Sequence, residues 1–339
     1  MSRLAYYCEM LRKIPPGKTL RRFYNYAKYR ALPRRAVTSV RRYAPQIGAL
    51  LLTKRCNLHC SYCNTAKLLK EAKGNWRDGE ATLDKTKAIV ANPLFEHCVL
   101  IDLLGGEPLL VGDIDRIVAY LTEQGYMTNM STNGILLAER IADLKRAGLS
   151  RINVSMYREN RAVLERDLAK SNQVFRAHSS LVLLGSEVEH QQESLFETVR
   201  FARDAGCLSM RFFAYRPMGN DPRPAEIVHA TLPAYREFRK RLDAAFPGFC
   251  LWPAAITSDT KKRCPQLWQR VGCDMLGNMG VCCGYDDLLP GEEANLFRDD
   301  PDVLYNHPTM VAMRRQLLDP TAPAPEMCRS CNLLGDPGW

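Results

Sequence analysis

Short apolar segments alternate with amphipathic segments from about residue 46 to residue 215, and this order most constrains how the 339-residue chain can fold. The amphipathic segments repeat their apolar residues at helical spacing, as Ile114, Ile117, Val118 and Leu121 do. Strands and helices in strict alternation predict an α/β fold with a parallel sheet and right-handed crossovers. The predicted strands are Ile47–Thr53, Val99–Leu104, Met127–Ser131, Ile152–Met156, Leu181–Leu184 and Met210–Ala214.

Unusual motifs stand directly after the first three of these strands. A cysteine-rich segment, residues 56–63, follows the first strand, and Gly105-Gly106-Glu107-Pro108 follows the second. The third strand ends in Thr132-Asn133-Gly134. Because the carboxyl ends of parallel strands meet at one edge of a sheet, these motifs are predicted to form one site there.

The cysteine-rich segment carries Cys56, Cys60 and Cys63, so three thiols lie on one short loop. Three thiolates on a four-iron cube would leave one iron without a protein ligand, and an open coordination position is where a metal does chemistry. A structural zinc ion is the alternative, but it needs four ligands, and His59 is the nearby candidate for the fourth.

Positive charge is concentrated at the amino end of the chain. Residues 1–45 hold twelve Lys or Arg and one acid, Glu9, which gives +11; since the chain carries +10, the remainder sums to −1. This arm, rich in tyrosine, could meet an anionic substrate, an acidic peptide, RNA or an anionic membrane surface. The alternative is a helix pair that covers the open end of the core, with its tyrosines packed inward.

Two absences predict where the protein works. No apolar run approaches the length of about 18–20 residues that a membrane-spanning helix needs, and the first residues lack the apolar stretch of a signal peptide. We therefore expect a soluble, cytoplasmic protein. In a reducing compartment most of the thirteen cysteines would be free or bound to metal rather than paired in disulfides, and Cys98 and Cys207 are predicted to be small buried hydrophobes.

Cys56-x3-Cys60-x2-Cys63 followed by Gly105-Gly106-Glu107-Pro108 resembles the radical S-adenosylmethionine (radical SAM) superfamily over roughly residues 46–215. The resemblance implies a partial (βα)6 barrel of the TIM type. It also implies a [4Fe–4S] cluster on the three cysteines, with the amino and carboxylate groups of S-adenosylmethionine on the open iron. In that family an external reductant of the flavodoxin or ferredoxin type supplies one electron, and the resulting 5′-deoxyadenosyl radical takes a hydrogen atom from the substrate.

The resemblance also implies contacts to S-adenosylmethionine. The two glycines would let the backbone approach a ligand closely, and the carboxylate of Glu107 would accept a hydrogen bond from the cofactor's ammonium group. At the ribose position the family often has Ser-Leu-Asp, whereas this chain has Ser155-Met156-Tyr157, so a role for the acid does not carry over. The implied cofactor-binding residues are Gly105, Gly106, Glu107, Ser131, Thr132, Asn133, Ser155 and Tyr62.

A second cysteine group resembles the auxiliary-cluster extension called SPASM, in its short form called twitch. Cys264, Cys282, Cys328 and Cys331 would ligate a second [4Fe–4S] cluster fully, which makes two clusters per chain, with a zinc site as the alternative. A fully ligated cluster would hold its α+β module together and carry an electron. The predicted domains are a basic helical arm (1–45), the barrel (46–216), a helical connector (217–263) and the auxiliary-cluster domain (264–339).

The predicted reaction is hydrogen-atom abstraction from a C–H bond of a small polar natural-product intermediate, such as a sugar or an aminocyclitol. Dehydrogenation or epimerisation would follow; for epimerisation a cysteine must return a hydrogen atom, and Cys250, Cys273 and Cys283 are the candidates. Arg211, Tyr215 and Arg216 are expected to face a polar or anionic substrate.

Two other readings stay open. One is a radical SAM maturase of a ribosomally made peptide, whose acidic leader the basic arm could hold. The other is a non-catalytic iron–sulfur protein that transfers electrons or binds RNA. RNA binding is disfavoured because Gly105-Gly106-Glu107 would then have no clear task.

Overall fold

A single parallel sheet organises the protein. The structure is a computed structural model that describes residues 16–31, 38–41, 43–60, 63, 79–216, 223–253, 264–282, 294–328 and 331. Within them eight strands pair in the order β7-β6-β5-β4-β3-β2-β1-β8, and every pair is parallel. The strands are β1 (Ile47–Leu51), β2 (Leu100–Leu104), β3 (Met127–Thr132), β4 (Arg151–Ser155), β5 (His178–Leu183), β6 (Met210–Ala214), β7 (Cys250–Leu251) and β8 (Arg270–Asp274).

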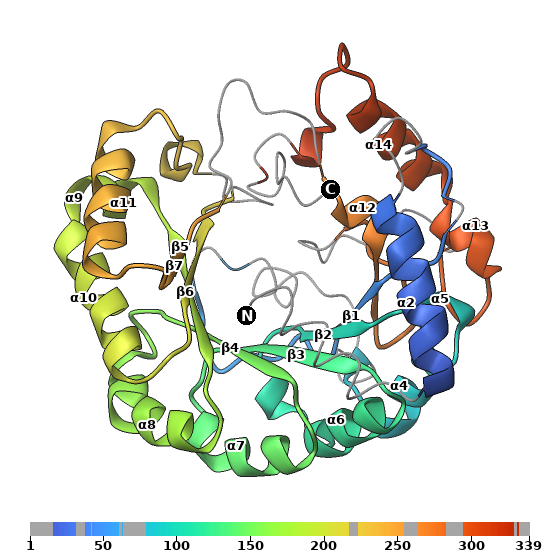
Figure 1. Cartoon of the computed structure of the whole chain (residues 1–339), viewed down its shortest axis with the longest axis horizontal. Helices are drawn as coiled ribbons and strands as arrows, with labels where there is room; N and C mark the ends of the chain where they lie inside the picture. Colours follow the sequence, from blue (N-terminus) through green and yellow to red (C-terminus); the bar gives the residue numbers. More distant parts are fainter. Residues whose placement is uncertain are drawn as a thin grey trace.

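The sheet curves into an open barrel with the helices on its outside, as the sequence predicted (Figure 1). The long α-helices are α2 (Pro16–Ala31), α4 (Leu83–Val90), α6 (Ile114–Glu123), α7 (Leu137–Arg146), α8 (Arg161–Val174), α10 (Gln192–Asp204), α11 (Pro233–Ala245) and α14 (Pro308–Leu318). The short ones are α5 (Pro93–Glu96), α9 (Gly185–His190), α12 (Gln266–Gln269) and α13 (Pro301–Tyr305), and the 3-10 helices are η3 (Pro108–Leu110), η4 (Pro224–Glu226) and η5 (Glu326–Cys328).

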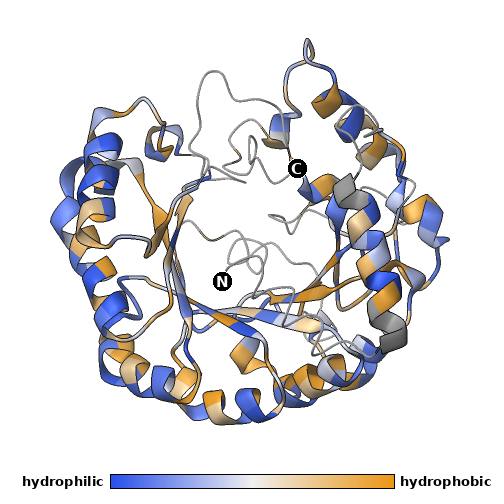
Figure 2. Ribbon diagram, viewed as in Figure 1, coloured by the Kyte–Doolittle hydropathy of each residue, from blue (hydrophilic) through white to orange (hydrophobic). Residues whose placement is uncertain are grey.

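The two faces of the sheet differ in chemistry. Leu50, Leu103, Met130 and Ile152 occupy one register row across β1 to β4, and all are fully buried against the outer helices. Figure 2 shows these helices apolar toward the sheet and hydrophilic toward solvent. Since side chains alternate along a strand, the residues between these point to the inside of the barrel. That inner face carries polar side chains, among them Asn129 and those described below.

Two of the eight strands lie outside the segment in which strands were predicted. β7 lies in the part predicted as a helical connector, and it is only two residues long. β8 belongs to the part predicted as the auxiliary-cluster domain, and it pairs with β1. The sheet therefore extends beyond the boundaries predicted at residues 216 and 263. The sequence of β8, Arg-Val-Gly-Cys-Asp, has too little apolar character to predict a strand, because its alternate residues face the polar interior.

The amino-terminal helix α2 lies over the edge of the sheet at which the strands begin. Its side chains donate to the carbonyl oxygens of Ala44, Glu96 and Gly125, which stand just before β1, β2 and β3. Tyr24 of this helix is 68% exposed rather than packed inward. None of the described helices is long and apolar enough to span a bilayer.

An ion pair inside the barrel joins the carboxyl-terminal part to the barrel. The guanidinium of Arg270 on β8 binds the carboxylate of Asp102 on β2, across the intervening β1. Only 12% and 10% of these side chains are exposed, and Asp102 Oδ1 also accepts a hydrogen bond from Asn129 Nδ2 at 2.8 Å. Removing one partner of such a pair is costly, because the other charge is then left buried without a counterion.

Removal of one partner should therefore be strongly destabilising. We expect Arg270→Met to lower the free energy of unfolding by about 3–5 kcal/mol, because it leaves the Asp102 carboxylate buried without its cation. Arg203→Met is the matched control, since its pair with Asp204 is about half exposed and should be worth ~0–1 kcal/mol. Urea unfolding followed by circular dichroism measures both, and equal midpoints for the two variants would contradict the assignment.

Candidate functional site

Three thiols lie together on the loop after β1. Cys60 is buried, Cys56 and Cys63 are partly exposed, and the Cys63 amide donates to the Cys60 carbonyl oxygen at 3.1 Å. Burial raises the pKa of Cys60 to about 12, and the negative charges of Glu159, Cys63 and Cys56 act in the same direction. The Cys60 thiol is therefore favoured as a thiolate by a bound cation, as in metal and iron–sulfur sites.

Hydrogen-bond donors surround the first of these thiols. Cys56 Sγ accepts from the amide of Leu58 at 3.4 Å and from Asn133 Nδ2 at 3.8 Å. Donors to sulfur stabilise its charged form. His59 is exposed to solvent, as expected for a surface residue rather than a fourth ligand. The donor set on this loop fits a cluster held by three thiolates.

Gly105 and Gly106 hold the cysteine loop against the end of β2. A Cβ atom on Gly105 would lie 2.4 Å from the carbonyl oxygen of Thr53, and one on Gly106 would lie 2.0 Å from that of Arg55. Gly105 also has φ of +140°, which side chains disfavour. The Gly106 and Glu107 amides each donate to this backbone at 2.7 Å. In the structure the close neighbour of both glycines is the backbone that leads to the cysteines, and a close approach to a ligand stays a prediction.

The Glu107 side chain is fully buried and joins two strand ends. Oε1 accepts from the Thr132 hydroxyl at 2.7 Å and the Leu109 amide at 3.0 Å, and Oε2 accepts from the Asn133 amide at 2.7 Å. Burial raises the pKa of Glu107, while these three hydrogen bonds lower it. A carboxylate oxygen has two lone pairs, so Oε2 retains one acceptor site. Its bond to an ammonium group remains a prediction.

The end of β3 connects to the cysteine loop through Asn133. Its Nδ2 donates to Asn57 Oδ1 at 2.7 Å as well as to Cys56. Ser131 lies two residues earlier and is half-buried. Ser155 ends β4, with its hydroxyl 3.4 Å from that of Ser180. Tyr62, also predicted to bind the cofactor, lies outside the described residues.

Sequence reasoning missed two residues next to this site. Asn160 is fully buried, and its Nδ2 donates to the carbonyl oxygens of Asn133 and Ser155 at 2.6 and 2.8 Å, which ties the ends of β3 and β4 together. Tyr157 lies near the three thiols: burial raises the pKa of its phenol, and the charges of Cys60, Cys63 and Cys56 raise it further. The only sequence signal for Tyr157 was that it stands where the family often has the aspartate of Ser-Leu-Asp.

The thiols of the second cysteine group come from three separate segments and lie near enough to act on one another electrostatically. Burial raises the pKa of Cys264 and of Cys328 to about 12. The next contribution comes from the other thiols: Cys331 and Cys328 act on Cys264, and Cys331 and Cys282 act on Cys328. The Cys331 amide donates to the Cys328 carbonyl oxygen at 3.0 Å, which repeats the turn between Cys60 and Cys63. Among the described residues no three His, Cys, Asp or Glu side chains group as the ligands of a single ion would.

The spare cysteines occupy different places. Cys250 pairs with Met210, the first residue of β6, so it lies at the edge of the sheet away from the cysteine loop. Cys273 pairs with Leu50 and is 5% exposed, so its thiol points outward into the apolar core rather than into the barrel. Cys283 lies outside the described residues. Cys98 and Cys207 are buried, as predicted.

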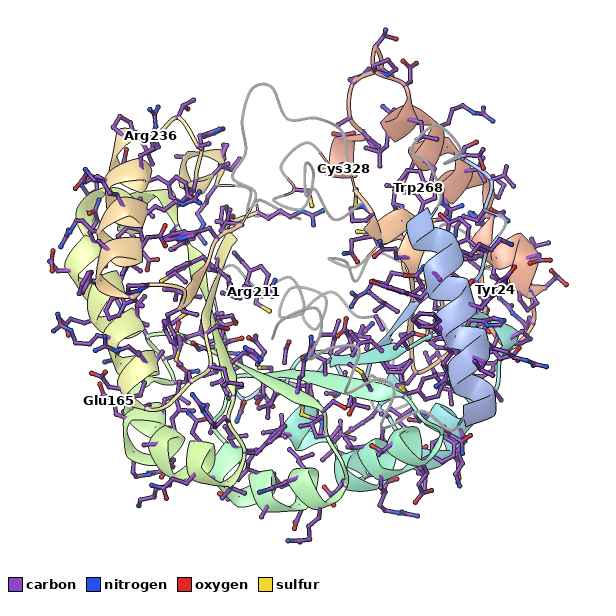
Figure 3. All side chains as sticks on the ribbon, in the orientation of Figure 1. Tyr24, Glu165, Arg211, Arg236, Trp268 and Cys328 are labelled. Carbon is purple, nitrogen blue, oxygen red and sulfur yellow. The ribbon has the colours of Figure 1, made fainter. Side chains whose placement is uncertain are left out.

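Cations line the inner face of the barrel. Arg211 extends from β6 toward the interior (Figure 3), in the register row of Ser155 and Ser180. The pKa of His178, at the start of β5, is lowered to about 4, chiefly by burial, and the charges of Arg151 and Arg211 act in the same direction.

The two other residues predicted to face the substrate lie past the end of β6. The Tyr215 side chain is buried, with the Arg223 guanidinium 5.3 Å from its ring centroid. The positive charge of Arg216 reaches Cys328 and opposes the rise in the pKa of that thiol that burial causes. Of the three predicted substrate residues, Arg211 faces the barrel interior, and Arg216 stands beside the second cysteine group.

Comparison with known proteins links this geometry to one superfamily. Residues 50–173 match the model of the radical SAM superfamily. The chain is 27% identical over 198 residues to an AdoMet-dependent heme synthase of Methanosarcina barkeri, which covers 55% of each protein. It is 36% identical over 121 residues to a probable GTP 3′,8-cyclase of Aeropyrum pernix, which covers 34% of this chain and 33% of that protein. The matches thus span about half the length of these curated relatives, or less.

Solved structures share the fold over most of the chain. Streptococcus suis SuiB bound to S-adenosylmethionine superposes with a TM-score of 0.64 at 16% identity, over 86% of this chain and 72% of SuiB. The AdoMet-bound protein anSMEcpe gives 0.61 at 14% identity, over 86% of this chain and 85% of that one.

The glycine contact predicts a specific effect on the cysteine loop. We expect Gly106→Ala to destabilise the protein by about 1–3 kcal/mol and to reduce its iron content, because the new methyl group would displace the backbone at Arg55. Gly112→Ala is the control, since a Cβ there meets nothing within 4 Å. Iron analysis after anaerobic purification compares the two; normal iron in Gly106→Ala would show that the contact is dispensable.

The cation-rich interior predicts the titration of His178. A base whose pKa is lowered on folding stabilises the protein fully above its unfolded pKa, near 6.5, and that stability is lost as the pH falls toward 4. In histidine NMR spectra, assigned with His178→Gln, its ring should stay neutral between about pH 7 and 5. A midpoint at or above 6.5 would show that the ring is neither desolvated nor held close to the Arg151 and Arg211 charges.

Proposed function

Since this chain carries a domain of the radical SAM superfamily, we propose that it abstracts a hydrogen atom from a small polar substrate held inside the barrel. The [4Fe–4S] cluster would be held by Cys56, Cys60 and Cys63. When bound, the reduced cluster and S-adenosylmethionine supply a 5′-deoxyadenosyl radical. The observation that carries the proposal is that three thiols, near enough to raise one another's pKa, share the loop at the carboxyl edge of the sheet; three thiolates would leave one corner of a cube for the cofactor.

The neighbouring residues would position the cofactor. Asn133 orients the cysteine loop through Asn57 and Cys56, and the free acceptor site of Glu107 Oε2 suits an ammonium group. The hydroxyl groups of Ser131 and Ser155, at the ends of β3 and β4, would line the nucleoside. Asn160 would keep these two strand ends at a constant separation.

The interior of the barrel supports a polar substrate with an anionic group. Arg211 presents its guanidinium there, and the amide of Asn153 and the hydroxyl of Ser180 lie on the same face, 2.8 Å apart. Two acids of the described strands lie at this face: Asp102 is paired with Arg270, and Asp274 accepts hydrogen bonds from Asn278 and from the Leu276 amide. Guanidinium, amide and hydroxyl donors together suit a phosphorylated or carboxylated sugar, or a related cyclitol.

Dehydrogenation is the outcome that the described cysteines favour. Epimerisation needs a thiol that faces the substrate, whereas Cys250 lies at the opposite edge of the sheet and Cys273 points into the core. Cys264, Cys282, Cys328 and Cys331 would hold a second cluster of the SPASM or twitch type and would supply an electron acceptor there. Arg216, between β6 and Cys328, would stabilise negative charge on it.

Cleavage of the cofactor tests the proposal directly. Reconstituted protein, reduced and incubated with S-adenosylmethionine, should form 5′-deoxyadenosine, and Cys60→Ala should form none because the cluster loses a ligand. Cys250→Ala is the matched control and should retain the activity, since it replaces a thiol at the far edge. A wild-type protein with intact iron and no product, or an active Cys60→Ala variant, would contradict the assignment.

The same preparations separate the two clusters. Cys331→Ala should lose about half of the iron per chain and should still cleave S-adenosylmethionine, because the loop after β1 is untouched. Unchanged iron content in this variant would remove the second cluster from the proposal and leave the first in place.

A further inference from the structure

Helix α2 turns two polar side chains toward the protein. Arg22 is 1% exposed and Asn25 is 7% exposed. The Arg22 guanidinium donates to the carbonyl oxygens of Glu96 and Gly125 at 3.1 and 2.6 Å and stacks 4.2 Å from the ring centroid of Tyr126. A buried arginine with these partners anchors the helix firmly.

The opposite side of α2 is apolar and exposed. Leu20, Phe23 and Tyr24, spaced to lie on one face of a helix, are 72%, 46% and 68% exposed. Surface helices normally bury their apolar side, so α2 is oriented in the reverse sense over residues 20–28, whose side chains the structure describes. Lys28 continues the exposed face, and Arg21 beside it is 73% exposed while it pairs with Glu96.

The charge of this region identifies the kind of surface it fits. The sequence of α2 has five Lys or Arg and no acid, and the arm of residues 1–45 carries +11 while the rest of the chain sums to −1. Exposed leucine and aromatic rings bordered by cations are typical of helices that lie in the interface of an anionic bilayer.

The position of α2 is compatible with such contact. The helix lies over the edge at which β1, β2 and β3 begin, whereas the thiols and the glycines lie at the other edge. A surface that covers α2 would therefore leave the mouth of the barrel open to substrate and reductant.

We propose that α2 docks the protein on an anionic phospholipid membrane. Leu20, Phe23 and Tyr24 insert at the boundary between headgroups and acyl chains, and Arg21 and Lys28 bind lipid phosphates. The inference is independent of the reaction at the barrel mouth. An acidic polypeptide and a second copy of the chain are the competing occupants.

Vesicle sedimentation tests the proposal with the full-length protein. Binding to vesicles of equal parts phosphatidylglycerol and phosphatidylcholine should exceed binding to pure phosphatidylcholine and should fall as salt rises. The triple variant Leu20→Ser/Phe23→Ser/Tyr24→Ser should bind the vesicles at least about tenfold more weakly than the wild type does. Arg21→Gln/Lys28→Gln should weaken binding by about fivefold per charge.

A control variant distinguishes this face from apolar exposure in general. Val303→Ser/Leu318→Ser removes side chains that are 59% and 40% exposed elsewhere and should bind as the wild type does. Iron content and circular dichroism should be the same in all variants, since every substituted residue is exposed. The proposal fails if vesicles are not bound, if the triple variant binds equally, or if poly-glutamate rather than vesicles is bound. It also fails if the triple variant instead abolishes a dimer.

Discussion

The structure of the candidate site depends on a contact between two strand ends that only glycine permits. The backbone at Gly105 and Gly106 packs directly on the backbone between Thr53 and Arg55, closer than any Cβ atom would allow. Two amide-to-carbonyl hydrogen bonds of 2.7 Å fix this approach. The loop that follows carries the three thiols, so their position relative to β2 is set by main-chain geometry, which varies little.

Glu107 extends the same connection to a third strand. Its buried carboxylate binds the ends of β3 through Thr132 and Asn133, and Asn133 in turn holds the cysteine loop. Hydrogen bonds thus connect the ends of β1, β2 and β3 to one another at one edge of the sheet. A rigid first layer of this kind is what a site requires when a reactive intermediate must meet one hydrogen atom of a substrate rather than its neighbours.

Much of this arrangement was predictable from the sequence, because strand ends and glycine pairs are local signals. The six strands between residues 47 and 214 follow from their apolar runs, although β5 begins three residues before the predicted start, where His178, Ser179 and Ser180 conceal it. β8 was missed because its inward residues match a polar interior. Asn160 was missed because its importance lies in joining the carbonyl oxygen of the nearby Ser155 to that of Asn133, 27 residues earlier in the chain, and no sequence pattern records such a contact.

The polar interior of the barrel and the orientation of α2 follow from the same rule about buried polar side chains. A polar side chain inside a fold persists where partners or a ligand satisfy it, as Asp102 is satisfied by Arg270 and Asn129. Arg22 of α2 obeys the rule with two carbonyl oxygens, and its burial leaves Leu20, Phe23 and Tyr24 outside. Their exposure is therefore a consequence of how the helix is anchored. A helix attached through its cation cannot turn its apolar side inward without leaving that cation unpaired, so the cost of exposing the apolar side is best offset by a surface that covers it.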